Sequence, residues 1–123
     1  MKVAVFALMF FLLVGCTTGQ LEYITPEGET QYACATEYTW QPSVDKYAVE
    51  YILSHCAKEA AKRGNTIIDK KLLSLDLTVP KPPQGQTWNV ELAKSMHKSG
   101  QLTDKQCGYL IAFIDLGLKQ LPE

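Results

Sequence analysis

The pattern of hydrophobic and polar residues predicts three short strands in the first two thirds of the chain. The predicted strands are residues 21–25, 30–40 and 71–79. Pro26 and Gly28 separate the first two, and because a tight turn favours a fixed φ and a positive φ at such positions, we expect a β-hairpin there. In the second strand the aromatic residues fall on one face at period two, and this face is predicted to be buried.

Apolar residues at helical spacing predict three helices. The first runs from Ser43 to Gly64, with an inner face made of Val49, Ile52, Leu53, Cys56 and Ala60. The other two, Trp88–Ser99 and Asp104–Leu118, are separated by Gly100, and Thr103 with Gln106 forms a capping box at the start of the last one. Asp115 is the only charge between Cys107 and Leu118, so the last helix is either the centre of the core or a docking surface.

This order of elements predicts an α+β fold. A small antiparallel or mixed three-stranded sheet, in the order β-β-α-β, is followed by a C-terminal helical hairpin. The prolines between residues 80 and 86 form an internal linker, since proline cannot continue a strand ladder. Residues 21–123 are therefore expected to be a single small globular domain.

The N-terminal segment differs from the rest of the chain. Lys2 is followed by the uncharged run Val3–Val14, which as a helix would span only about 18 Å, less than a membrane requires. The run ends in Leu13-Val14-Gly15-Cys16, which resembles the lipobox of bacterial lipoproteins. We therefore expect residues 1–15 to be a signal peptide.

The resemblance to lipoproteins implies that Cys16 becomes the first residue of the mature chain and carries acyl groups such as palmitate. Two or three acyl chains would anchor the protein stably in a lipid bilayer. Residues 16–20 would then be a short lipid-anchored tether. Because Thr17 and not Asp follows the cysteine, the resemblance implies an outer-membrane location facing the periplasm in a Gram-negative cell envelope.

The C-terminal hairpin is similar to the short helical-hairpin domains found at the ends of many bacterial proteins. The resemblance depends on the segment from Ser99 to Gln106, where Gln106 stands in a position that is more often Glu in that family. Helix capping alone would produce the same residues. The apolar last helix departs from the family, so no function is carried over from it.

If Cys16 is lipidated, Cys34, Cys56 and Cys107 remain in an oxidising compartment. We expect a disulfide between Cys34 and Cys56, because both lie on predicted inward faces of elements that must pack together. Another pairing, or none, stays possible from sequence alone. Cys107 would then be a buried thiol.

Few residues have the spacing that catalysis or metal binding requires. The cysteines, His55 and His97 lack the close pairing of a zinc site, and no nucleophile elbow, phosphate-binding loop or dinucleotide fingerprint occurs. Lys and Arg number 12 against 13 Asp and Glu, which argues against binding nucleic acid. The sequence therefore predicts no catalytic residue, no metal and no cofactor.

By elimination, the sequence predicts a non-enzymatic accessory or protein-interaction factor of the bacterial envelope. Its candidate contact face for an envelope protein partner is Tyr109, Phe113 and Leu116 on the last helix. The alternative is a small apolar ligand-binding lipoprotein. Its predicted pocket between the sheet and the helical hairpin is lined by Tyr32, Tyr38, Trp40 and Trp88.

Overall fold

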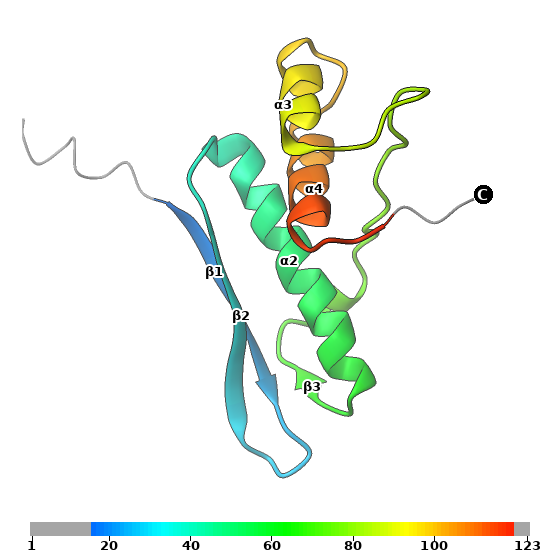
Figure 1. Cartoon of the computed structure of the whole chain (residues 1–123). Coiled ribbons are helices and arrows are strands. Elements are labelled where there is room, and N and C mark those ends of the chain that lie inside the picture. Colours follow the sequence, from blue (N-terminus) through cyan, green and yellow to red (C-terminus); the bar gives the residue numbers. More distant parts are fainter. Residues whose placement is uncertain (1–15, 120–123) are drawn as a thin grey trace, which may run out of the picture.

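The computed structural model describes residues 16–119, so the predicted leader at 1–15 lies outside the described residues. Strands β1 (Thr17–Ile24), β2 (Thr30–Tyr38) and β3 (Thr66–Ile67) form an antiparallel sheet in the order β2-β1-β3. The helices are α2 (Pro42–Lys62), α3 (Val90–Lys98) and α4 (Asp104–Asp115), with a 3-10 turn, η2, at Lys70–Leu73. Helix α2 lies between the sheet and the α3–α4 hairpin (Figure 1). The predicted α+β fold, with its three-stranded sheet and C-terminal helices, is confirmed.

A β-bulge in β2 changes which side chains face α2. Gly19 pairs with Thr36 and Leu21 pairs with Ala33, so β2 carries one residue more than β1 between these pairs. Cys34 lies in the bulge and has a φ of 55°. Because an extra residue reverses the alternation of side chains, Tyr32, before the bulge, is 58% exposed, whereas Tyr38, after it, packs against the buried clusters. The predicted buried aromatic face is therefore wrong for Tyr32 and confirmed for Tyr38.

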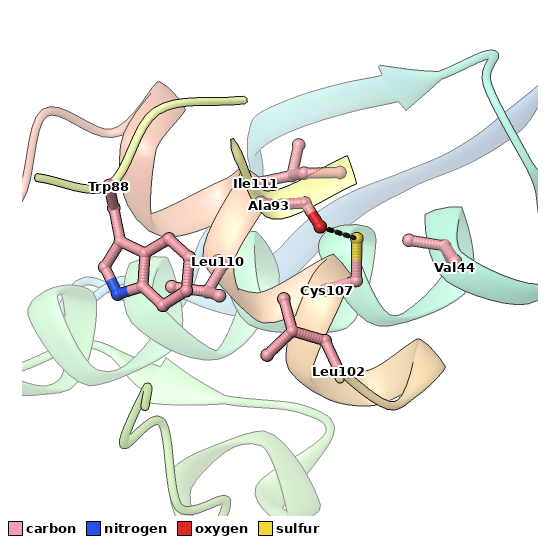
Figure 2. Close-up of a cluster of buried hydrophobic side chains, with 7 residues drawn as sticks. All are labelled: Val44, Trp88, Ala93, Leu102, Cys107, Leu110 and Ile111. Atoms are coloured by element: carbon pink, nitrogen blue, oxygen red, sulfur yellow. Dashed lines mark hydrogen bonds between the residues drawn. The ribbon is translucent and has the colours of Figure 1, made fainter. Parts of the chain in front are cut away.

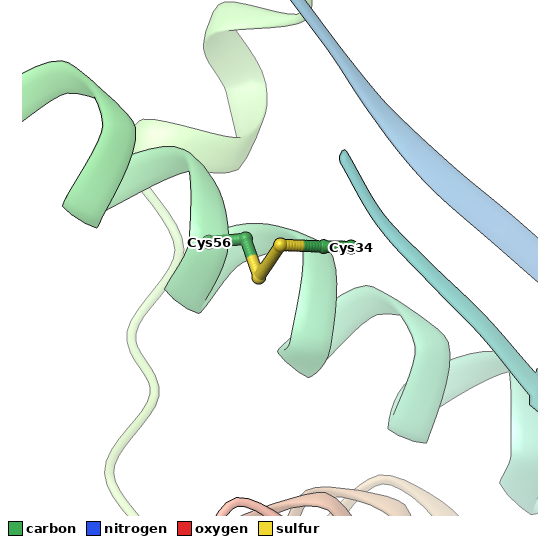
Figure 3. Close-up of a disulfide and its surroundings, with 2 residues drawn as sticks. All are labelled: Cys34 and Cys56. Atoms are coloured by element: carbon green, nitrogen blue, oxygen red, sulfur yellow. A yellow bond between two sulfur atoms is a disulfide. The ribbon is translucent and has the colours of Figure 1, made fainter. Parts of the chain in front are cut away.

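The bulge also places Cys34 for a disulfide with α2. Cys34 and Cys56 are bonded, with their Cα atoms 6.5 Å apart, and Figure 3 shows the bond crossing from the hairpin to the helix. The predicted pairing is confirmed, and Cys107 is a free, buried thiol. Closing a loop of this length stabilises a fold by about 3 kcal/mol in the chain-entropy description.

Two predicted segments have a different structure. The expected tether at 16–20 is the beginning of β1, because Thr17 and Thr18 pair with Tyr38 and Glu37. The third strand was predicted at 71–79, but β3 is Thr66–Ile67, which pairs with Tyr23 and Ile24.

The segment at 71–79 runs beside α2 without a strand partner. The hydroxyl of Ser54 donates to the carbonyl of Leu72 at 2.6 Å, and the ammonium of Lys58 donates to the carbonyl of Leu75 at 2.5 Å. Leu77 and Val79 pack against the buried clusters of α2 and α4. The alternation of apolar and polar residues in this segment therefore marks the side that is buried. The backbone carbonyls of Leu72 and Leu75, however, are hydrogen-bonded by side chains of α2 and not by a neighbouring strand.

Helix α2 is buried on two sides because it is the middle layer. Toward the sheet, a Cβ atom added to Gly19 would lie 2.6 Å from Cγ1 of Val49, so β1 approaches the helix closely. Leu21, Ala57, Ala60 and Ile67 form the buried cluster on this side. Toward α4, Val44 and Ala48 are almost fully buried, at 0% and 1% exposure.

Helix α4 is the centre of the second half of the core. All six residues from Cys107 to Ala112 are buried, and Figure 2 shows the cluster around Cys107, whose thiol donates to the carbonyl of Ala93 at 3.7 Å. A Cβ atom added to Gly108 would lie 2.5 Å from the carbonyl oxygen of Val44 and 2.7 Å from the Cβ of Tyr47. Helices α2 and α4 are therefore in backbone contact at this glycine. The capping box of Thr103 and Gln106 is present, as predicted.

The substitution Gly108→Ala tests this contact. Alanine normally stabilises a helix by roughly 0.5–1 kcal/mol relative to glycine. Here we expect the opposite, a loss of about 2–4 kcal/mol in the free energy of unfolding, because the rigid backbone of α2 must move to admit a methyl group. Urea unfolding followed by circular dichroism measures it. Ser95→Ala, at an exposed position of α3, is the control; equal stability of both variants would contradict the contact.

Candidate functional site

The predicted anchor residue lies at the edge of the folded domain. Cys16 is exposed and directly precedes β1. The pKa of its thiol is raised, chiefly because the thiol is hydrogen-bonded to Glu37 of β2. Because Thr17 is already paired in the sheet, a group attached to Cys16 would be held next to the domain.

The four aromatic residues predicted to line one pocket are not brought together. Tyr32 is exposed on the outer part of the hairpin, and Tyr38 donates its hydroxyl hydrogen to Asp115 at 2.8 Å. Trp40 is 41% exposed and lies against α3, where the ring of His97 is 5.9 Å away. Trp88 is buried and donates its indole N–H to the carbonyl of Pro80 at 2.8 Å. The prediction of one pocket lined by all four residues is therefore wrong.

A different apolar groove occurs at the C-terminal end of α4. It has a volume of about 540 Å³ and lies in the layer across α2 from the sheet. Its walls come from the proline-rich segment, the residues before α3 and the end of α4. They include Pro82, Trp88, Phe113, Ile114, Leu118 and Lys119.

The predicted contact face of α4 is split between the core and this groove. Tyr109 is 2% exposed and packs edge-on against Tyr51, with ring centroids 5.2 Å apart. Phe113 and Leu116 are half-buried, and Phe113 lines the groove. Of the three residues, only these two have surface that a partner could reach.

The sequence prediction missed the rest of the groove because it extended the last helix to Leu118. The helix ends at Asp115, and Gly117 has a φ of 68°, so the chain turns away and Leu118 leaves the helical stripe. Gly117, two residues after Asp115, was the signal for this end of the helix.

The remaining thiol is poorly suited to nucleophilic chemistry. Cys107 is fully buried, and burial raises the pKa of its thiol to about 11. Since the thiolate is the reactive form, this thiol is almost entirely protonated near neutral pH. Among the described residues, no group of three or more His, Cys, Asp or Glu side chains is placed to hold a metal ion.

No protein-family model, curated protein or solved structure matches the chain. Within residues 16–119, no helix has the length and hydrophobicity needed to cross a membrane.

Two tyrosine–carboxylate hydrogen bonds join α4 to β2 and to α2. They predict how the stability of the domain depends on pH. Tyr38 donates to Asp115, and Tyr109 donates to Glu50 at 3.0 Å. Burial, together with these carboxylates, raises the pKa of both phenols above the usual value.

We expect the free energy of unfolding to fall as pH rises above about 10, because the unfolded phenols lose protons that the folded ones retain. Each tyrosine contributes a slope of up to about 1.4 kcal/mol per pH unit. Urea unfolding between pH 9 and 11 measures the slope. Tyr38→Phe should make it shallower, whereas Tyr32→Phe, at an exposed phenol outside both bonds, is the control; identical slopes in both variants would refute the assignment.

Proposed function

We propose that this chain is a lipid-anchored protein of the bacterial cell envelope that acts without catalysis, by binding a protein partner. The observation that carries the proposal is Cys16, which follows the lipobox-like Leu13-Val14-Gly15 and is exposed at the start of β1. An acyl group on this residue would enter the bilayer without disturbing the core. In a Gram-negative cell, the proposed location is the outer membrane, facing the periplasm.

The Cys34–Cys56 disulfide supports export. Disulfides form and persist in oxidising compartments such as the periplasm and are rare in the cytosol. The bond joins the hairpin to α2, so it fixes the strand pair that begins at Cys16 to the middle layer of the domain.

The groove at the end of α4 supports partner binding. It is open to solvent and is lined by Trp88, Phe113 and Leu118, with Lys119 at its rim. Aromatic and apolar side chains of this kind are the usual anchors of protein interfaces. A protein segment that contributes an apolar side chain would cover them.

A small apolar ligand is the alternative occupant. The volume of about 540 Å³ falls within the range of ligand pockets. An open groove would leave part of such a ligand in water, which favours a protein partner. Native mass spectrometry of the protein extracted from cells would detect a co-purifying small molecule and so support the alternative.

Metabolic labelling with palmitate tests the anchor. We expect wild-type protein to be labelled and to fractionate with membranes, and Cys16→Ser to lose both the label and the membrane association, since a hydroxyl cannot form the thioether. Cys107→Ala, which leaves Cys16 intact, is the control and should retain the label. Equal labelling of wild type and Cys16→Ser would refute lipidation at this residue.

Photo-crosslinking in intact cells tests the groove. A photoreactive amino acid in place of Lys119, at the groove rim, is expected to give a discrete crosslinked protein. The same substitution at Lys62, an exposed residue at the end of α2, is the control and should not give that product. The product from position 119 should weaken at least about threefold with Phe113→Ala, because truncating an aromatic anchor typically costs more than 1 kcal/mol. Equal crosslinking from both positions would contradict the assignment.

A further inference from the structure

The end of the domain that carries Cys16 also exposes a tryptophan. Thr17 pairs with Tyr38, and Trp40 follows Tyr38 closely in the chain. Figure 1 shows that β1 begins at the same end of the molecule as α2 and the loop between α3 and α4. With 41% of its surface exposed, Trp40 is therefore on the side of the domain that a lipid on Cys16 would bring to the bilayer.

The surroundings of Trp40 combine an aromatic ring with positive charge. The ammonium of Lys94 lies 4.6 Å from the ring centroid, and the ring of His97 meets it edge-on. Lys46, near the start of α2, and Lys98, the last residue of α3, are also exposed. Tryptophan and lysine are enriched where proteins meet the headgroup region of a membrane, and lysine is attracted to anionic lipids.

A buried carboxylate, that of Asp45, contacts the backbone of Trp40. Asp45 is 2% exposed, and burial raises its pKa. Backbone hydrogen bonds to this carboxylate from Gln41 and Trp40, and the charge of Lys94, oppose that rise. The backbone of the loop that carries the tryptophan is thus held to the start of α2.

We propose that this end of the domain docks on the bilayer to which Cys16 anchors it, with the indole of Trp40 in the headgroup region and Lys94 beside lipid phosphates. The inference rests on the proposed lipidation of Cys16. Because β1 begins at the next residue, no length of flexible chain holds the domain away from the membrane surface. The contact would set one orientation of the domain on the bilayer.

Fluorescence quenching tests the contact, because the chain contains two tryptophans in different environments. The full-length protein is expressed in cells, extracted in detergent and reconstituted into vesicles of phosphatidylcholine and phosphatidylglycerol with brominated acyl chains. In Trp88→Phe only Trp40 emits, and we expect at least about twofold quenching, since an interfacial indole lies within reach of the bromines. In Trp40→Phe only the buried Trp88 emits, and it should be nearly unquenched. If Trp88→Phe does not fold, the difference between wild type and Trp40→Phe gives the same quantity.

A charge substitution provides a second readout. Lys94→Gln is expected to lower the quenching of Trp40 in vesicles that contain phosphatidylglycerol. Lys62→Gln, at the end of α2 that is far from Trp40, should leave the quenching unchanged. An equal effect of the two substitutions would overturn the role of Lys94.

The mass of the reconstituted protein separates the two proposals. If Cys16 carries acyl chains and Trp40 is not quenched, the docking surface is refuted and the anchor stands. If Cys16 carries no acyl group, the anchor is refuted and the docking surface falls with it.

Discussion

The fold depends on how closely its layers approach α2. A Cβ atom at Gly108 would overlap the backbone of α2 at Val44, and one at Gly19 would overlap Val49 on the opposite side of the same helix. Two glycines from distant parts of the chain thus let a helix and a strand lie against a single helix. Helix α2 is therefore densely packed on both sides, and we expect a larger residue at Gly19 or Gly108 to be destabilising. All other features of the domain are arranged around this three-layer contact.

The three layers carry different parts of the proposed function. The sheet begins one residue after Cys16, the proposed attachment point, whereas α4 and the segment before α3 form the groove. Because α2 is in close contact with both layers and is bonded to the hairpin through Cys34 and Cys56, the two surfaces keep a fixed geometry. A partner bound in the groove would therefore be held in a defined relation to the anchored end of the sheet.

Local signals in the sequence predicted the elements whose structure is decided locally. The hairpin turn, the span of α2, the Gly100 break and the capping box of Thr103 follow from backbone and capping preferences. The disulfide pairing was predicted correctly, but it is the bulge at Cys34 that places this residue toward α2. The third strand was misplaced because alternation reports which side is buried and not what bonds the backbone. The predicted inward side of β2 was wrong before the bulge, at Tyr32, because no residue type announces a bulge at Cys34. Gly108 was missed, although a glycine inside an otherwise apolar helix is a known sign of close packing.

Three side chains within α4 or in contact with it have pKa values raised by burial. Raised values often mark active sites when several such groups share one cleft. Here the phenols of Tyr38 and Tyr109 each donate to one carboxylate, and the thiol of Cys107 donates to the carbonyl of Ala93 in the core. None of the three lines the groove. Their raised pKa values follow chiefly from burial against or within α4.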